Sequence, residues 1–465
     1  MTDQKLRGIP PVHRFLSEPR IAAYEALLGR EHVKARIADT LDESRCHPDP
    51  SMPQDRASSK NGRGIEAFSF DSLCAQVLDK LERSAFDLLV PVINGTGILL
   101  HTNLGRAPLA TTALEAMTAA GAGYSNLEYD VWEGRRGSRY ARTTSLLQSV
   151  TGAEDALIVN NCAAAVLLVL DTFAKGREVI VARNQLIEIG GGFRLPDVLE
   201  RSGARLVEVG ATNKVYLKDY ERALTADTAL LLRSHPSNYR ITGFTHDVEA
   251  ADLAALAKRT GIPLVEDLGS GALVDLGEYG LPHERTVQEA VREGIDLITF
   301  SGDKMLGGPQ AGIIVGKSVL IARLRSNPLL RALRVDKLTL AALAQTLRLY
   351  FVPEARKQIP FFAMLGASIE ELRERAKRYV DCISGARVIE THAYVGGGSL
   401  PESAIPSIGI ALRPQRGATA AAQILRRAPM PIIARIDEGE LVLDLRTIFP
   451  NDDERVLAAL QHLIA

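Results

Sequence analysis

The chain has 465 residues, of which 46% are hydrophobic and 24% charged, and this is the composition of a globular protein. Its net charge of −1 excludes polyanion binding driven by overall charge, although a local basic patch is compatible with it. No apolar run reaches the roughly 18 residues of a transmembrane helix, the N-terminus has no secretory signal, and the four cysteines form no CxxC pair. We therefore expect a cytoplasmic protein that buries a large core without disulfides or metals.

The first part of the chain predicts a small helical domain. Apolar residues at helical spacing indicate short helices over roughly 8–45. Residues 46–64 are rich in Pro, Ser, Gly and charged residues, which is typical of a linker or long loop. Helical periodicity returns over 65–87. We therefore predict a small domain with its linker over 1–64.

A long α/β domain follows, over 65–335 with the 65–87 helix as its entry. Short β-branched runs alternate with helical stretches, and this cadence predicts a mostly parallel sheet with helices on both faces. Residues 336–465 begin with helices and end in strands and two more helices, which indicates a smaller α+β domain. The predicted strands are 156–159, 178–182, 205–209, 229–233, 263–266, 297–300 and 312–315, and the predicted helices between them are 163–174, 194–202, 247–260 and 284–293.

Ligands of open parallel sheets bind at the carboxyl ends of the strands, so the residues that follow each strand are the first candidates for a site. After the strand 156–159, the small residues Asn161, Cys162 and Ala163 begin a helix whose free N–H groups suit a phosphate. Taken alone, this pattern fits equally well an Ala-rich helix that packs closely on the sheet.

Two charged residues follow later strands. Asp267 ends a buried strand, where a carboxylate needs a partner such as a protonated pyridine nitrogen, although a helix N-cap is an alternative. Lys304 follows another strand in the string SGDKMLGGPQ, where an apolar neighbourhood lowers the pKa of an amine and favours condensation with an aldehyde. The alternative for Lys304 is a surface lysine in a turn. Ser301 is placed to hydrogen-bond a cofactor phosphate.

The order of these three signals is that of the fold-type I enzymes that use pyridoxal phosphate (PLP). The three signals are a small-residue helix start, an Asp at one strand end and a Lys at a later strand end. Each lies at the carboxyl end of a strand, which is where an open parallel sheet binds its ligand. A Rossmann dehydrogenase is disfavoured because no GxGxxG occurs, and a P-loop enzyme because no GxxxxGK[ST] occurs. The nine histidines show no HExxH and no pairing with cysteine, which disfavours a metal site.

Longer strings go beyond this cofactor pattern, and together they resemble the bacterial selenocysteine synthase family, the L-seryl-tRNA(Sec) selenium transferases. The resemblance covers nearly the whole chain, and its most family-specific parts are the lysine loop and HTNLGR. The strings are INGTGILLHTNLGRAPL (93–109), NLEYD (126–130), TGAEDALIVNNCAAAVLLVL (151–170), EIGGGFRLPDV (188–198), SNYRITGFT (237–245), DLGSGALVDLGEYGLP (267–282), TFSGDKMLGGPQAGIIVGK (299–317) and RALRVDKLTLAAL (331–343).

The resemblance implies a reaction, partners and an assembly. The reaction converts L-seryl-tRNA(Sec) to L-selenocysteinyl-tRNA(Sec) with selenophosphate as selenium donor, through a PLP-bound aminoacrylyl intermediate that forms by loss of water. The resemblance also implies dimer units in a larger ring, usually a homodecamer, and an N-terminal domain that binds the tRNA. The basic residues available for this binding are Lys5, Arg7, Arg14, Arg20, Arg30, Lys34 and Arg36.

Further site residues follow from the resemblance and from the chemistry. Selenophosphate is an anion, and the implied cations are Arg106, Arg331 and Arg334, the last two one helical turn apart on a shared face. Asp303, next to Lys304, is a candidate for proton transfer to the departing hydroxyl, with loop hydrogen bonding as its alternative. The other candidates are Asn238 and Tyr239, which we expect to touch cofactor or substrate, and His235, which either packs on the cofactor ring or is a hydrogen-bonded core histidine.

Two other functions fit part of the pattern. The cofactor motifs alone also fit a PLP-dependent lyase that acts on a free amino acid or amino sugar acid. A non-catalytic tRNA-binding protein with the same fold is disfavoured by the intact pair Lys304 and Asp267. The N-terminal region separates the first two possibilities, because a lyase with a free substrate has no need of it.

Overall fold

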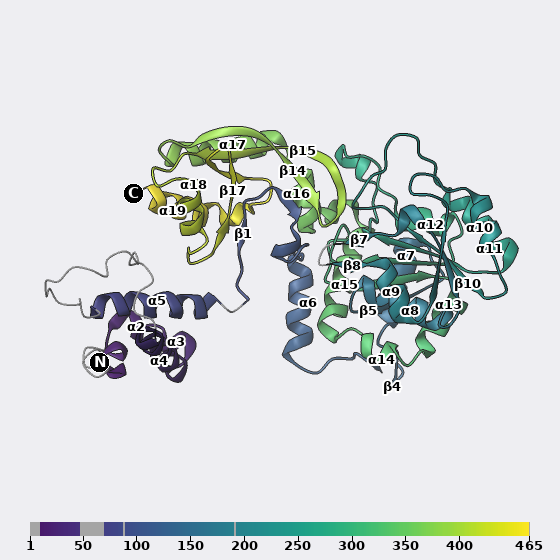
Figure 1. Cartoon of the computed structure of the whole chain (residues 1–465), viewed down its shortest axis with the longest axis horizontal. Coiled ribbons are helices and arrows are strands. Elements are labelled where there is room, and N and C mark those ends of the chain that lie inside the picture. Colours follow the sequence, from purple (N-terminus) through teal and green to yellow (C-terminus); the bar gives the residue numbers. More distant parts are fainter. Residues whose placement is uncertain (1–9, 47–68, 87–88, 190–191, 465) are drawn as a thin grey trace, which may run out of the picture. The chain divides into compact units, whose positions relative to one another are not determined.

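The computed structural model describes residues 10–46, 69–86, 89–189 and 192–464 (Figure 1). The chain divides into two compact units, Met1–Pro91 and Val92–Ala465. Within the described residues, no helix is both long enough and apolar enough to cross a membrane. Most of the predicted linker, residues 47–64, lies outside the described part of the chain.

The first unit is a helical bundle with its own core. The residues Phe15, Ile21, Val33 and Ile37 are fully buried together with Leu73, Val77 and Leu81 of the last helix, which recur at helical spacing. Because that helix covers the core of the first four, the division of the chain lies at Pro91 and not at the predicted residue 64. The helices are α1 (Val12–Leu16), α2 (Pro19–Ala22), α3 (Glu25–Leu28), α4 (Arg30–Cys46) and α5 (Phe70–Phe86).

The second unit contains a seven-stranded sheet in the order β5-β13-β12-β11-β10-β6-β9. All neighbours are parallel except β13, which runs antiparallel to both β12 and β5, so the predicted mostly parallel sheet is confirmed. The strands are β5 (Asp155–Val159), β6 (Glu178–Ala182), β9 (Arg205–Val209), β10 (Thr228–Ser234), β11 (Leu264–Gly269), β12 (Leu297–Ser301) and β13 (Gly312–Gly316).

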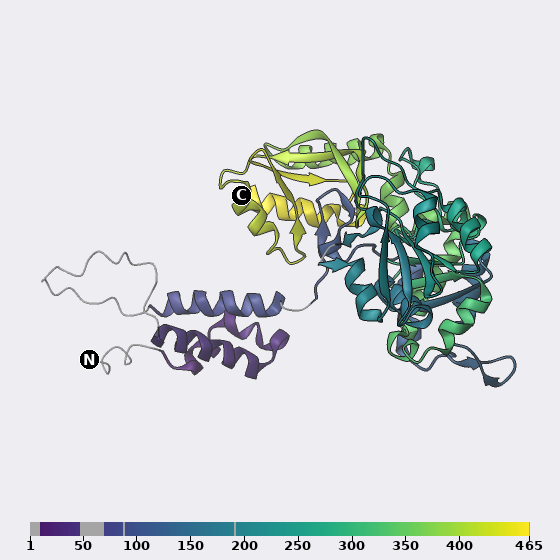
Figure 2. The same ribbon diagram turned by 45° about the vertical axis from the view of Figure 1, so that its right-hand side comes forward.

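Helices surround this sheet, as Figure 2 shows. The inward residues of most of these helices form one large apolar core with the strands, which are largely buried except for the edge strand β9, as is typical of a parallel sheet with both faces covered. The helices are α6 (Thr111–Ala122), α7 (Ala141–Thr151), α8 (Cys162–Phe173), α9 (Leu195–Ser202), α10 (Leu217–Ala223), α11 (Ala250–Thr260), α12 (Val287–Arg292), α13 (Ser318–Ser326), α14 (Leu330–Leu333), α15 (Lys337–Arg348) and α16 (Pro360–Gly366). Two small hairpins pair β3 (Tyr129–Asp130) with β4 (Arg135–Arg136) and β7 (Glu188–Ile189) with β8 (Phe193–Arg194).

A second sheet, in the order β17-β18-β15-β14-β2, has a separate apolar core. A turn at Glu438 and Gly439, both with positive φ, joins two antiparallel strands in the tail of the chain. Residues 98–100 pair with this C-terminal sheet, and residues 93–94 pair with residues 432–433 in a separate two-stranded sheet, although the predicted boundaries place both segments in the larger domain. The elements are β1 (Ile93–Asn94), β2 (Ile98–Leu100), α17 (Ile369–Cys382), β14 (Arg387–Gly396), β15 (Ser399–Leu412), α18 (Ala418–Leu425), β16 (Ile432–Ile433), β17 (Arg435–Asp437), β18 (Glu440–Asp444) and α19 (Asp453–Ile464).

Candidate functional site

Asp267 lies near the carboxyl end of β11, and its carboxylate is held by two side chains. Thr299 on the neighbouring strand donates its hydroxyl to Asp267 Oδ1 at 2.8 Å, and the Cys162 thiol donates to the same oxygen at 3.3 Å. The alternative of a helix N-cap is therefore wrong. With both side-chain donors on Oδ1, the other oxygen, Oδ2, keeps a lone pair for a further donor.

The electrostatics of this carboxyl group reflect its burial. Burial raises the pKa of Asp267, while the hydrogen bonds from Thr299 and Cys162 and the nearby charge of Lys304 act in the opposite direction. Burial, followed by the neighbouring Asp267, raises the pKa of the Cys162 thiol well above its usual range, so the thiol stays protonated and acts as a donor. A cation bound against Asp267 would stabilise its ionised form.

Lys304 follows β12 and is 5% exposed, so the alternative of a surface lysine is wrong. Its Nζ lies 3.8 Å from the position that a Cβ of Gly269 would occupy, and Ser237 Oγ lies 3.9 Å from the same position. Gly269 has a φ of +62°, a conformation that favours glycine. Ser237 is a buried residue that the sequence reasoning missed, and its only sequence signal is its place just after the end of β10.

The start of α8 is packed against the end of β13. Asn161 caps the helix by accepting a hydrogen bond from the backbone N–H of Ala164 at 2.9 Å. A Cβ on Gly312 would lie 2.0 Å from the Asn161 carbonyl oxygen, so only glycine permits this close approach. Ser301 pairs in register with Gly312, which pairs with Val159 at the end of β5. The register therefore brings Ser301 close to the first turn of α8, where Cys162 and Ala163 lie.

Arg106 and Asp303 form an ion pair at 2.9 Å across 197 residues of sequence. The backbone at Arg106 has a φ of 64°, which is uncommon outside glycine and occurs in a tight turn of the HTNLGR string. The backbone N–H of Ala107 also donates to the Asp303 carbonyl at 3.3 Å. The turn thus holds Arg106 against the residue that precedes Lys304.

Arg331 and Arg334 line a hollow of about 420 Å³ together with Arg136, Arg139 and Tyr140. The predicted shared helical face is wrong, because α14 ends at Leu333 and Arg334 is extended. Neither Arg331 nor Arg334 has an ion-pair partner among the described residues, and the buried Tyr140 hydroxyl has no hydrogen-bond partner there either. Arg106 does not line this hollow, so the structure does not gather the three predicted arginines there.

The segment that carries Arg334 runs beside the end of β5. Arg334 forms a backbone bridge with Val159, and the backbone N–H of Asn160 donates to the Leu333 carbonyl at 3.0 Å. The cationic hollow therefore lies next to the turn that leads into α8. This is the edge of the sheet where Cys162 contacts Asp267.

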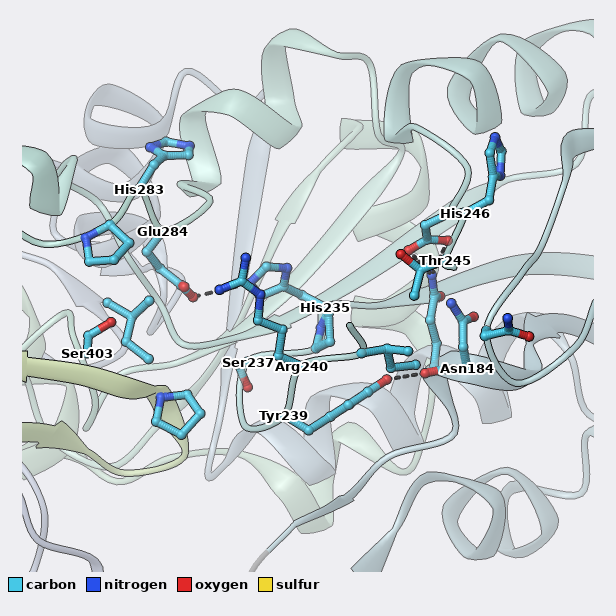
Figure 3. A pocket seen from close by; sticks show the side chains of 18 residues that line it. Asn184, His235, Ser237, Tyr239, Arg240, Thr245, His246, His283, Glu284 and Ser403 are labelled. Carbon is cyan, nitrogen blue, oxygen red and sulfur yellow. Dashed lines mark hydrogen bonds and ion pairs between the residues drawn. The ribbon is translucent and has the colours of Figure 1, made fainter. Parts of the chain in front are cut away.

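The three candidates after β10 have protein partners. The His235 backbone N–H donates to the Asp267 carbonyl at 2.9 Å, and His235 Nε2 lies 3.3 Å from Glu284 Oε1. Asn238 donates through Nδ2 to the Glu188 carbonyl at 3.0 Å, and Tyr239 donates its hydroxyl to the Asn184 carbonyl. Tyr239 and His235 line a second hollow, shown in Figure 3.

Comparison with known proteins identifies the family. Residues 92–449 match the family model described as SelA, L-seryl-tRNA selenium transferase. The chain is 54% identical to the L-seryl-tRNA(Sec) selenium transferase of Solidesulfovibrio magneticus, over 97% of this chain and 96% of that protein. It is 47% identical to the enzyme of the same name from Moorella thermoacetica, over 98% of this chain and 96% of that protein.

The chain belongs to the L-seryl-tRNA selenium transferase family. The family model begins at Val92, the first residue of the second unit, so it covers the fold that carries Lys304 and Asp267. The prediction of a PLP-dependent transferase is confirmed by this membership.

The fold of this selenium transferase family member is also found in a solved D-glucosaminate-6-phosphate ammonia-lyase. The TM-score is 0.57 at 21% sequence identity, with 81% of this chain and 96% of that chain covered. At this identity the likeness shows the fold alone, and it confirms the predicted fold-type I architecture.

Proposed function

We propose that the chain converts L-seryl-tRNA(Sec) to L-selenocysteinyl-tRNA(Sec), with pyridoxal phosphate held at the carboxyl ends of β5, β11 and β12. The observation that carries this proposal is the buried amine of Lys304 beside a buried carboxylate, Asp267, that two side chains hold in place. These residues suit the cofactor: Lys304 for covalent attachment, Asp267 for the ring nitrogen, and Ser301 with the first turn of α8 for the phosphate.

The residues after β10 fit the same placement of the cofactor. Ser237 Oγ and Lys304 Nζ both lie near the position that a Cβ of Gly269 would occupy. The backbone N–H of His235 donates a hydrogen bond to the carbonyl of Asp267. We therefore keep His235 and Asn238, with Asn161, Cys162 and Ala163 of the α8 start, as proposed cofactor neighbours.

When bound, pyridoxal phosphate supplies an electron-accepting ring that stabilises negative charge at the Cα of the substrate. Asp267 would hold a proton on the ring nitrogen. The amine of Lys304 would take the proton from Cα of the serine and pass a proton to the Cβ hydroxyl, which leaves as water. We propose that Asp303, whose carboxylate is fixed in position by its ion pair with Arg106, assists this transfer as a hydrogen-bond acceptor. Selenium from selenophosphate would then add at Cβ while water cleaves its bond to phosphorus and releases phosphate, and Lys304 would return a proton to Cα.

We propose selenophosphate as the selenium donor, bound by Arg331 and Arg334. Two guanidinium groups without ion-pair partners among the described residues, and the unpaired hydroxyl of Tyr140 in the same hollow, suit a phosphate-like anion. Arg106 contributes less free charge, because Asp303 already neutralises it.

The competing function is a PLP-dependent lyase that acts on a free amino acid or amino sugar acid. The experiment that decides is an assay of the purified chain with seryl-tRNA(Sec) and selenophosphate, run beside free serine and selenophosphate. We expect selenocysteinyl-tRNA in the first reaction and no selenocysteine in the second. Turnover of free serine with no product on tRNA would contradict the proposal.

We propose that the first unit binds the tRNA, and its removal provides a test. Of the predicted basic residues, Lys5 and Arg7 lie outside the described part of the chain, while Arg20, Arg30, Lys34 and Arg36 form exposed ion pairs. Exposed pairs of this kind contribute roughly 0–1 kcal/mol, so phosphates of a tRNA can replace the acidic partners at little cost.

Deletion of residues 1–91 is expected to leave a folded, cofactor-binding protein that binds seryl-tRNA weakly. The cut falls at the boundary between units, whereas a cut at residue 64 would expose the apolar face of α5. The lost binding is expected to be the salt-sensitive part, because contacts to phosphates release counterions. Binding of seryl-tRNA(Sec) at two salt concentrations measures this, and equal affinity and equal salt slope for both chains would remove the proposed role.

We also propose a homo-oligomer, for which a decamer is the expected size. The hairpin β3–β4 supports an assembly because Tyr129, Val131 and Trp132 are at least half exposed there, with Trp132 at 95%. Light scattering on the full chain measures the mass.

A further inference from the structure

The hollow in Figure 3 adjoins the Lys304 site and has a volume of about 410 Å³. Ser237 lines this hollow, and its Oγ lies near the position that a Cβ of Gly269 would occupy, as Lys304 Nζ does. His235 lines it too, and its backbone is bonded to that of Asp267. A ligand in the hollow therefore lies directly beside a substrate bound at Lys304.

The charges that line this hollow do not suit a phosphate or another anion. Among its described lining residues, Arg240 points toward Glu284, and His246 Nδ1 lies 2.7 Å from the Val215 carbonyl (Figure 3). His283 lies 3.2 Å from Asp275, and this hydrogen bond raises the pKa of the imidazole. Each of these basic groups thus already has an oxygen nearby.

The unused capacity of the hollow lies in hydrogen-bond acceptors. Glu284 is 4% exposed, and its Oε1 accepts no hydrogen bond from the described residues, although Arg240 points toward its carboxylate and His235 Nε2 lies 3.3 Å from Oε1. Asn184 Oδ1 is likewise buried without a partner at the other end of the hollow. A buried acceptor without a partner is costly, so the hollow fits a neutral ligand that brings N–H or O–H donors.

The walls between these acceptors are flat and largely apolar. Tyr239 lies along the hollow, and its hydroxyl is fixed by the bond to the Asn184 carbonyl (Figure 3). Burial raises the pKa of Tyr239, so the ring stays neutral. Leu400 and Pro401 of β15 also line the hollow. An aromatic ring beside apolar side chains is a surface on which a nucleobase stacks.

We infer that this hollow binds the 3′-terminal adenosine of the seryl-tRNA, with the base against Tyr239 and its exocyclic amine directed to the unpaired Asn184 Oδ1. The inference rests on the proposed function, in which the seryl group is esterified to the ribose of that adenosine. When the serine amine reaches Lys304, the adenosine is only a few bonds away, and the hollow is far larger than a seryl group requires.

The test measures binding of three small ligands to the full-length holoenzyme by calorimetry. They are serine methylamide, 3′-deoxy-3′-(L-serylamido)adenosine, and the same amide built on purine riboside, which lacks the exocyclic amine. We expect the adenosine ligand to bind more than about tenfold tighter than the methylamide, because stacking on an aromatic ring has this magnitude. The purine riboside ligand is expected to recover only part of that gain.

Variants of Tyr239 separate stacking from a general loss of structure. Tyr239→Leu is expected to weaken both nucleoside ligands about tenfold and to leave serine methylamide unchanged. Tyr239→Phe, which keeps the ring, is expected to bind close to wild type. Tyr124→Leu is the matched control, because Tyr124 is fully exposed and does not line the hollow.

Two results would overturn the inference while leaving the proposed function intact. One is equal affinity of the wild-type protein for the methylamide and the adenosine ligand. The other is an equal loss for all three ligands in Tyr239→Leu. If the wild-type holoenzyme binds none of the three seryl ligands, the proposed function itself fails, and the inference fails with it.

Discussion

Replacement of Lys304 by alanine is expected to reduce the formation of selenocysteinyl-tRNA by at least about a thousandfold, since the variant loses both the covalent attachment of the cofactor and the base for the Cα proton. Borohydride reduction of the wild-type protein is expected to fix the cofactor on the peptide that contains Lys304. The same treatment of Lys304→Ala is expected to release the cofactor on denaturation. Mass spectrometry of the digested protein measures both outcomes.

A matched lysine variant shows that the effect is specific. Lys258 is exposed near the end of α11 and is not a residue of the proposed site, so Lys258→Ala is expected to retain wild-type turnover and labelling. Covalent labelling of Lys304→Ala at another lysine, or near wild-type turnover of that variant, would assign the attachment to a different residue.

The α/β part of the fold could be predicted because its signal is local. The run Glu178–Ala182 and the run Arg205–Val209 are strands with the predicted bounds, since β-branched runs flanked by helical stretches have few other structures available. The same signal placed Asp267 and Lys304 at strand ends, and the sheet topology alone brings those ends to one edge.

The features that sequence reasoning missed depend on contacts between distant residues. The helix α5 was assigned to the wrong unit because its amphipathic pattern shows that it packs, but not which helices it packs against. The pair Arg106 and Asp303 spans 197 residues, and no spacing rule connects them.

The partners of a buried side chain set another limit on the site prediction, because they come from distant parts of the chain. Thr299 and Cys162 contact Asp267 only because β12 lies beside β11 and α8 begins at the same edge of the sheet. Sequence alone indicated that a buried carboxylate needs partners, without saying which side chains provide them. Similarly, the spacing in RALR predicts that Arg331 and Arg334 share one helical face. The helix α14 ends at Leu333, however, so Arg331 lines the hollow from the helix and Arg334 lines it from the extended segment that follows.

The hydrogen bond from Thr299 to Asp267 has a consequence for catalysis that a conservative pair of variants can measure. Thr299 is fully buried, and valine has nearly the same shape, so Thr299→Val removes one donor to Oδ1 with little change in packing. A hydrogen bond to a charged group contributes about 1.5–3 kcal/mol, so turnover is expected to fall roughly tenfold or more, and Thr299→Ser is expected to restore it. Unchanged turnover in Thr299→Val would show that the Cys162 thiol alone orients the carboxylate.

Asp267→Asn is expected to keep the fold and the cofactor but to lose turnover by a factor between roughly thirty and several thousand, the range that corresponds to about 2–5 kcal/mol for an uncompensated buried charge. The amide has nearly the same shape as the carboxylate and can still accept the hydrogen bonds from Thr299 and Cys162, so packing changes little. It carries no charge, however, and therefore does not hold a proton on the ring nitrogen. The absorbance spectrum of the bound cofactor against pH gives a readout independent of turnover, because a structural role for Asp267 would leave that titration unchanged. Wild-type turnover together with a wild-type titration would show that another group protonates the ring.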